Sequence, residues 1–260
     1  MTQKTALITG ASAGLGREFA RQLAAAGKDL ILVARRTEPM QEIARALESE
    51  HGVRANVIRA DLSERDAALQ LFENIRERGL QVDYLINNAG AHSPDLLHDR
   101  DWPAYQKYVE LMMTSVTGLC HYFIPPMRER GFGRVLNVAS VAGQITMSGD
   151  YSYGPTKAYV IALSKALSMT LRPHGVYVLA LCPGWTHTDF HASERLTRMK
   201  KSIPAFLWYD AALVVREGLA ALEQGKSVFT TGRIYRFLVP ILRTSLSRWL
   251  MLKIGVKRDW

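Results

Sequence analysis

The chain has 260 residues, of which 48 % are hydrophobic and 22 % are charged, and its two cysteines, Cys120 and Cys182, lie far apart in the sequence. This composition predicts one α/β domain over residues 1–260 and excludes a disulfide framework or a paired-cysteine zinc site. The first residues lack a signal-peptide pattern and no apolar run is long enough to span a bilayer, so we expect a cytoplasmic protein.

The first predicted unit is a strand, a glycine turn and a helix. Residues 4–9 form a short apolar strand, and Gly10, Gly14 and Gly16 separate it from an amphipathic helical pattern. Glycines let the backbone approach a pyrophosphate, which the N-terminus of a helix also attracts. The spacing is G-x3-G-x-G and not the commoner G-x-G-x-x-G. A phosphate cradle and an ordinary surface turn are both compatible with this stretch alone.

The second strand, residues 29–34, is apolar almost throughout and ends in Arg35 and Arg36. An acidic residue at this position would accept the ribose hydroxyls of NAD, whereas an arginine pairs with a 2′-phosphate. The sequence therefore favours NADP(H). Solvated charge at a strand end is the alternative interpretation.

Later strands also end in polar residues. Asp61 follows the third strand, where it would either contact an adenine or begin the next helix. Residues 87–90, Asn-Asn-Ala-Gly, follow the fourth strand at the carboxyl end, where open α/β sheets bind ligands. Alternating strands and helices predict a doubly wound parallel sheet with helices on both faces. The remaining predicted elements are helices at 40–50, 63–78, 105–130 and 153–172 and strands at 55–60, 84–86, 134–139 and 177–181.

Ser140, Tyr153 and Lys157 are the predicted catalytic residues. Tyr153 and Lys157 are four residues apart and would share one face of a helix. A nearby ammonium lowers the pKa of a phenol from about 10, which would let Tyr153 transfer protons near neutral pH. Ser140, at the end of the fifth strand, would hold a substrate oxygen against the phenol. Because a Tyr-x3-Lys pair arises easily by chance, a surface lysine beside a half-buried tyrosine is the alternative.

The segment after the sixth strand is expected to reach the other end of the cofactor through Pro183, Gly184, Thr186 and Thr188. His187 and His191 have a spacing that can seat a metal, but no third ligand is in view, so we predict no metal site. Residues 185–210 are rich in apolar side chains and lysines. They are predicted to form a substrate lid, with ordinary packing as the alternative.

The C-terminal tail, residues 232–260, holds seven basic residues and one acidic residue, so most of the net charge of +9 belongs to it. Its leucines and Trp249 follow helical spacing, but Lys253 interrupts the apolar side. We expect the tail to dock on the body of the protein or on a second subunit. An anionic membrane surface is the first alternative, and nucleic acid is less favoured because no recognition module appears.

These motifs together resemble the classical short-chain dehydrogenase/reductase family. Thr9-Gly10-x3-Gly14-x-Gly16, Asn87-Asn88-Ala89-Gly90, Ser140, Tyr153-x3-Lys157 and Pro183-Gly184 occur in the order and approximate spacing of that family. The resemblance implies a Rossmann fold and hydride transfer between NADP(H) and a carbonyl carbon, with Ser140, Tyr153 and Lys157 as the catalytic residues. The implied cofactor-binding residues are Gly10, Ser12, Gly14, Leu15, Gly16, Arg35, Arg36, Asp61, Leu62, Asn88, Ala89, Gly90, Tyr153, Lys157, Pro183, Gly184, Thr186 and Thr188.

One position departs from the family pattern. Met112 occupies the place of the family's catalytic asparagine, and a thioether cannot carry a proton relay from Lys157 to solvent. Ser115, one helical turn later, is the candidate for binding the relay water instead. We expect a reductase of a lipophilic ketone such as a keto-lipid, ketosteroid or 3-oxoacyl compound, assembled as a homo-dimer or homo-tetramer. A non-catalytic NADP-binding sensor is the main alternative, and a dehydratase or epimerase is a further one.

Overall fold

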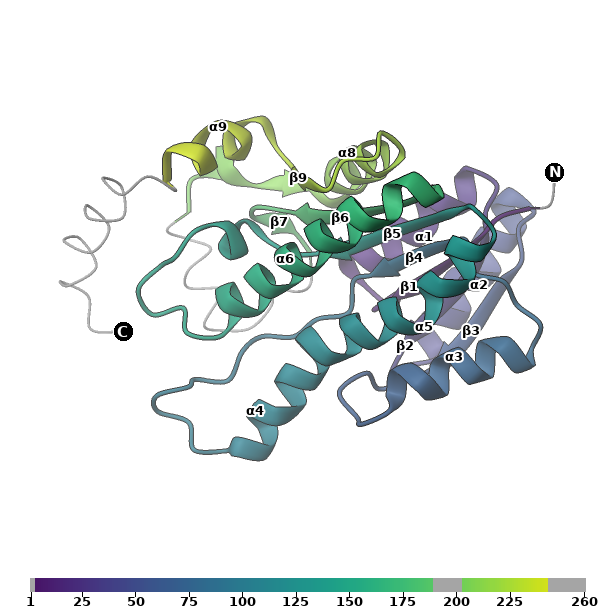
Figure 1. The fold of residues 1–260 in the computed structure, drawn as a ribbon, viewed down its shortest axis with the longest axis horizontal. Helices are drawn as coiled ribbons and strands as arrows, with labels where there is room; N and C mark the ends of the chain where they lie inside the picture. The colour runs from purple at the N-terminus through teal and green to yellow at the C-terminus, as the bar shows by residue number, and fades with distance from the viewer. Residues whose placement is uncertain (1–2, 189–202, 243–260) are drawn as a thin grey trace.

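The computed structural model describes residues 3–188 and 203–242, and its centre is a seven-stranded parallel sheet in the order β3-β2-β1-β4-β5-β6-β9 (Figure 1). The chain order reverses between β1 and β4, which are hydrogen-bonded neighbours. This is the doubly wound fold predicted from the sequence. The strands of this sheet are β1 Thr5–Thr9, β2 Asp29–Ala34, β3 Ala55–Arg59, β4 Tyr84–Asn87, β5 Gly133–Val138, β6 Val176–Cys182 and β9 Val228–Thr230.

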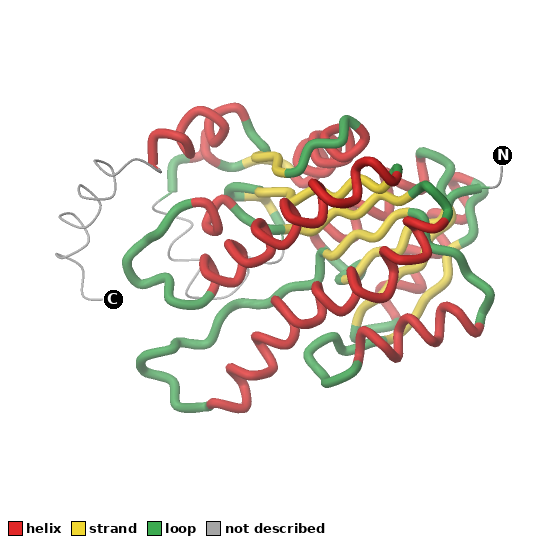
Figure 2. Tube along the Cα trace, in the orientation of Figure 1, coloured by secondary structure: helices red, strands yellow, loops and turns green. Residues whose placement is uncertain are grey.

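Helices cover both faces of the sheet, as Figure 2 shows. The helices are α1 Gly14–Ala25, α2 Glu38–His51, α3 Ala67–Glu77, α4 Trp102–Val109, α5 Ser115–Glu129, α6 Tyr153–Leu171, α8 Ala211–Glu223 and α9 Arg233–Leu242. Side chains of α1, α2 and α8 pack in one core cluster, and those of α3 and α5 pack in a second cluster with the end of α6. Strands buried on both faces explain the nearly continuous apolar runs in β1 and β2.

The helix predicted at 105–130 is longer than expected and contains a break. It begins with α4, passes through a π-helical turn, η1 Glu110–Thr114, and continues as α5, so that Figure 1 shows one long rod. A π-turn inserts one extra residue into the helix and is frequently found at functional sites. Here it contains Met112.

The helix after β3 begins later than predicted. It starts at Ala67 rather than Ser63, and the Asp61 carboxylate accepts hydrogen bonds from the backbone N–H (3.0 Å) and the hydroxyl (2.7 Å) of Ser63. Asp61 therefore closes a local turn at the end of the strand. The interpretation of Asp61 as the first acid of the helix is wrong.

Shorter elements complete the described chain. None of the helices in the two described ranges is long and apolar enough to cross a bilayer. The short elements are the 3-10 turns η2 Val141–Gln144, η3 Arg172–His174 and η5 Ala205–Leu207, and a separate two-stranded sheet of β7 Thr186–His187 and β8 Tyr209–Asp210.

Candidate active site

The glycine turn after β1 and the loop after β4 form one hydrogen-bonded unit. The Thr9 hydroxyl oxygen accepts the backbone N–H groups of Asn88 and Ala89, both at 3.0 Å, and the Asn88 side-chain amide donates to the Thr9 carbonyl at 2.9 Å. Gly10 has a φ of +66°, and a Cβ there would lie 2.9 Å from the Ala89 Cα. The two chain segments meet at the point where the strand order reverses, which is where this kind of sheet binds ligands.

The start of α1 fits a pyrophosphate. A Cβ on Gly16 would lie 2.1 Å from the Gly10 carbonyl oxygen, so only glycine allows this close turn. The N-cap residue Ala13 provides no side-chain cap, and the first turn contains no acidic residue, which leaves the N-terminal N–H groups for an anion. Thr188 lies across the turn, its Cβ 3.3 Å from the position of a Cβ on Gly14. Ser12 and Leu15 are half-buried in the same turn.

Arg35 and Arg36 are exposed at the end of β2, and neither forms an ion pair with another described residue. Arg35 is close enough to Asp61 to affect its ionisation. Burial acts to raise the pKa of Asp61, but the hydrogen bonds from Ser63 and then the charge of Arg35 lower it overall. The ends of β2 and β3 thus present a cationic and an anionic group beside the glycine turn.

Ser140, Tyr153 and Lys157 meet at the carboxyl ends of β5 and β6. Ser140 and Tyr153 are hydrogen-bonded through their side chains, and Tyr153 is the first residue of α6. The Lys157 ammonium lies 5.7 Å from the centre of the Tyr153 ring and donates to the Val138 carbonyl at 2.8 Å. The three predicted catalytic residues are therefore brought together, on the side of the sheet where the glycine turn lies.

The electrostatics of this cluster differ from the prediction. Burial raises the pKa of Tyr153 to about 12, with the Ser140 hydrogen bond acting in the opposite direction and the charge of Asp150 adding to the rise. Burial also lowers the pKa of Lys157 to about 8. The expectation that Lys157 lowers the phenol's pKa is wrong for the protein on its own, because loss of hydration dominates both groups.

Asp150 is a site residue that the sequence did not reveal. Its carboxylate accepts the backbone N–H of Gly154 with both oxygens at 2.9 Å, at the start of the helix that carries Tyr153. A Cβ on Gly154 would lie 2.6 Å from one of these oxygens, so the glycine permits the close contact. An acidic residue shortly before a predicted helix is the signal that would have identified it.

Ser115 holds the π-turn, and Met112 joins this turn to the loop after β4. The Met112 sulfur accepts the backbone N–H of Ala91 at 3.4 Å, next to the loop after β4. The Ser115 N–H bonds to the Glu110 carbonyl, and the Ser115 hydroxyl donates to the Leu111 carbonyl at 2.7 Å. In a regular α-helix the Ser115 N–H would bond to the Leu111 carbonyl. Here the Ser115 hydroxyl makes that bond instead. Only its oxygen, as an acceptor, remains for the predicted water, and that role stays a prediction.

The remaining predicted cofactor-binding residues are Leu62, Gly90, Pro183, Gly184 and Thr186. The side chain of Leu62 is buried in the core, and the Thr186 hydroxyl donates to the Gly184 carbonyl at 3.0 Å, so neither group points freely into a site. Pro183 accepts the N–H of Val141 at 2.9 Å, beside Ser140. Gly90 lies against Met112, whose sulfur would be 3.6 Å from a Cβ there.

The predicted lid and tail are described only in part. His187 stacks on Trp208, their ring centres 5.0 Å apart, and the described residues contain no group of three potential metal ligands. In the tail, α9 packs on the protein's own body, with Tyr235 and Val239 buried and Phe237 exposed. Residues 189–202, which include His191, and residues 243–260 lie outside the described part of the chain.

Comparison with known proteins agrees with this geometry. A model of the short chain dehydrogenase family matches residues 4–199. The chain is 34 % identical to sulfoacetaldehyde reductase 2 from Chromohalobacter salexigens, over 84 % of this chain and 92 % of that protein. It is 29 % identical to a 3-oxoacyl-[acyl-carrier-protein] reductase from Aquifex aeolicus, over 77 % of this chain and 82 % of that protein.

Two solved structures are similar over nearly the whole length. A bulky-bulky ketone specific alcohol dehydrogenase from Comamonas testosteroni has a TM-score of 0.76 and 29 % identity, over 99 % of this chain and 93 % of that one. A short-chain dehydrogenase from Sphingobium yanoikuyae in complex with NADPH has a TM-score of 0.77 and 30 % identity, over 98 % and 94 %. With the order of the strands and the Ser-Tyr-Lys cluster, these similarities lead to one conclusion: the chain belongs to the short chain dehydrogenase family of oxidoreductases.

Proposed function

We propose that this protein is an NADP(H)-dependent oxidoreductase that interconverts a lipophilic ketone and a secondary alcohol. The observation that carries the proposal is the hydrogen bond between Ser140 and Tyr153, with Lys157 beside them at the same sheet edge as the glycine turn. Bound NADP(H) supplies the chemistry of hydride transfer to or from a carbonyl carbon. The protein's own residues bind the nucleotide, orient the substrate and move a proton at its oxygen.

The nucleotide-binding part of the proposal depends on backbone and charge. Gly10, Gly14 and Gly16 with the start of α1 would hold the pyrophosphate. Arg35 and Arg36 would hold a 2′-phosphate, since they are exposed and form no ion pair with a described acid. The NADPH complex of the relative from Sphingobium yanoikuyae supports this choice of cofactor.

The proton would move at the Tyr153 oxygen. Ser140 would hold the substrate oxygen, and Tyr153 would deliver its proton in the reductive direction or remove it in the oxidative one. A phenol with a pKa near 12 holds its proton at neutral pH, which suits the reductive direction. Lys157, with a pKa of about 8, would be the group that restores the proton to the phenol.

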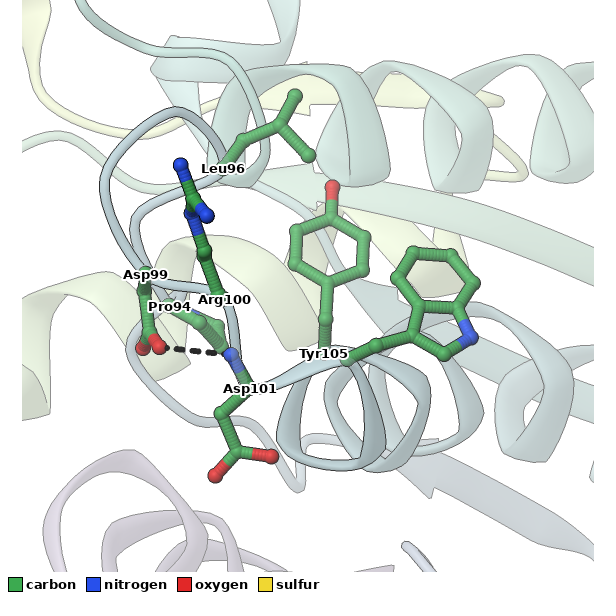
Figure 3. Close-up of a pocket in the computed structure, with 7 residues that line it drawn as sticks. Pro94, Leu96, Asp99, Arg100, Asp101 and Tyr105 are labelled. Carbon is green, nitrogen blue, oxygen red and sulfur yellow. Dashed lines mark hydrogen bonds between the residues drawn. The ribbon is translucent and has the colours of Figure 1, made fainter.

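A lipophilic substrate is proposed from exposed apolar side chains near the site. The loop before α4 and the start of α4 expose Leu97 and Trp102, each 60 % accessible. The same segment lines a surface pocket that combines the apolar Leu96, Trp102 and Tyr105 with the charged Asp99, Arg100 and Asp101 (Figure 3). Solvent-exposed apolar groups beside a binding site favour an apolar ligand. The relative from Comamonas testosteroni is specific for bulky-bulky ketones, which supports a large ketone as the substrate class.

A panel of keto-lipids, ketosteroids and 3-oxoacyl thioesters, assayed by the loss of NADPH absorbance, tests the proposal. Tyr153→Phe is expected to lower kcat at least about 100-fold while leaving the Kd for NADPH within a few-fold, because it removes only the transferable proton. NADPH binding without reduction of any carbonyl by the wild type would favour a non-catalytic sensor. The loss of the family's asparagine at Met112 is the observation that supports this second candidate.

Oligomerisation, cytoplasmic location and contact of the tail with a membrane stay predictions. In the described part of the tail, α9 is bonded to the body through the Tyr235 hydroxyl, which donates to the Leu207 carbonyl at 2.9 Å and accepts the Trp185 N–H at 3.2 Å. Light scattering of the purified protein measures the oligomeric state. Co-sedimentation with liposomes, comparing the full chain with one ending at Leu242, measures membrane contact.

A further inference from the structure

Two tyrosines of α4 reach the first turn of α6, the helix that carries Tyr153. The Tyr105 hydroxyl lies 3.0 Å from the Ser152 hydroxyl, and the Tyr108 hydroxyl lies 3.2 Å from that of Thr156. Ser152 immediately precedes Tyr153, and Thr156 follows it by three residues. The two contacts therefore bracket the residue that the proposed reaction depends on.

The direction of the second contact follows from counting protons. The Thr156 hydroxyl donates its single hydrogen to the Tyr153 backbone carbonyl at 2.8 Å, so it can only accept from Tyr108. The hydrogen bonds thus run from the Tyr108 phenol to Thr156 and from Thr156 to the backbone of Tyr153. Tyr108 and Thr156 are each only 4 % exposed, so water does not compete for these bonds.

From this geometry we propose that Tyr108 is a positioning residue for Tyr153 and acts through the Thr156 hydroxyl, with Tyr105 supporting the same turn through Ser152. The inference rests on the proposed function, because it assumes that Tyr153 is the acid/base. A phenylalanine at 108 would fill the same space but leave the Thr156 oxygen without its donor. The phenol of Tyr153 projects from the backbone that this chain of bonds holds, and small errors in the placement of a reacting group have large effects on rate.

The molecule contains a matched control. Tyr159 of α6 and Thr117 of α5 make the same kind of contact, with their hydroxyls 2.7 Å apart, and Thr117 donates to the Met113 carbonyl at 3.0 Å. This is also a tyrosine that donates to a threonine whose proton is committed to a backbone carbonyl. It joins the same rod to the same helix, but the carbonyl it reaches belongs to Met113 and not to Tyr153. Tyr159→Phe therefore removes a bond of the same kind, between half-buried hydroxyls, without touching the first turn of α6.

The kinetic test is a double-mutant cycle with a carbonyl substrate that the wild type reduces. Tyr108→Phe and Thr156→Val are each expected to lower kcat about 5-fold, the rate change of one neutral hydrogen bond. The KM for NADPH should not change. If Tyr108 acts through Thr156, the double variant loses no more than either single variant. Thr156→Ser, which keeps the hydroxyl, should retain the wild-type rate, as should Tyr159→Phe.

Amide hydrogen exchange gives a readout that does not need turnover. In the peptide 150–158, Tyr108→Phe should speed exchange several-fold, whereas Tyr159→Phe should leave it unchanged. Hydrogen exchange therefore tests the positioning role independently of the proposed function. If the wild type reduces no carbonyl, the proposed function fails, but the exchange rates still show whether Tyr108 holds the turn. Additive losses in the double variant, or equal effects of Tyr108→Phe and Tyr159→Phe on kcat and exchange, would overturn the inference.

Discussion

Replacing Lys157 by methionine should make the protein more stable while removing its activity. The Lys157 side chain is almost completely buried, with 6 % of the residue exposed, and its ammonium donates to the Val138 carbonyl at 2.8 Å. Burial lowers the pKa of this amine from 10.5 to about 8, which means that the fold disfavours its charged form. Methionine has a similar length and carries no charge.

The size of the effect follows from the two pKa values. The difference between 10.5 and about 8 corresponds to a cost of roughly 3 kcal/mol for holding the charged amine in the folded protein at pH 7. Losing the hydrogen bond to Val138 would cost about 2 kcal/mol, because its donor is charged. We therefore expect Lys157→Met to raise the free energy of unfolding by about 1 kcal/mol at pH 7, a trade of stability for activity that is common at functional sites.

The pH dependence has a defined sign. Because the pKa is lower in the folded state, the unfolded chain holds this proton more tightly, and the charge opposes folding fully below pH 8. The opposition fades as the pH rises toward 10.5, so the advantage of Lys157→Met should shrink over this interval.

Urea unfolding followed by tryptophan fluorescence, at several pH values from 6 to about 10, measures this effect. Lys165→Met is the control, since Lys165 is an exposed lysine of the same helix and its replacement should change stability little at any pH. A Lys157→Met variant that is less stable than wild type at pH 7, or whose advantage does not change with pH, would refute the reasoning. Loss of carbonyl reduction in the same variant would confirm that the charge is kept for function.

Three further substitutions test separate parts of the site. Arg35→Ala should weaken NADPH binding roughly 10- to 100-fold in a fluorescence titration and leave NADH binding unchanged, because only NADPH carries the 2′-phosphate; equal effects on both would contradict the role of Arg35. Gly184→Ala places a Cβ 2.0 Å from the Tyr235 ring and should lower the free energy of unfolding in urea by about 1 to 3 kcal/mol. In a Tyr235→Ala variant, which lacks the ring, adding Gly184→Ala should cost much less. Met112→Leu keeps the volume but removes the acceptor for the Ala91 N–H, so exchange of that amide should accelerate; an unchanged rate would mean that the 3.4 Å sulfur contact contributes nothing.

The local parts of the site were predictable because they depend on short spacings. Alternating apolar strands and amphipathic helices indicate a doubly wound sheet, and such a sheet places the ends of β1, β4, β5 and β6 along one edge. Once these ends share an edge, Gly10, Asn88, Ser140 and Tyr153 must lie near one another. The helix period alone places Lys157 one turn beyond Tyr153.

The pKa values of the site residues and their contacts with distant side chains could not be predicted in this way. The phenol's pKa is governed by how deeply Tyr153 is buried and by Asp150, and burial is a property of the packed molecule. The contact of Tyr108 with Thr156 joins residues 48 positions apart, and a tyrosine in a helix does not indicate which helix its hydroxyl will reach. The sequence by itself determined the fold class, because the alternating strand and helix periods specify it. Its motifs indicated the family by resemblance and pointed to the candidate reacting groups. Only the tertiary structure decided their protonation and their support, because both arise when helices far apart in the chain pack together and exclude water.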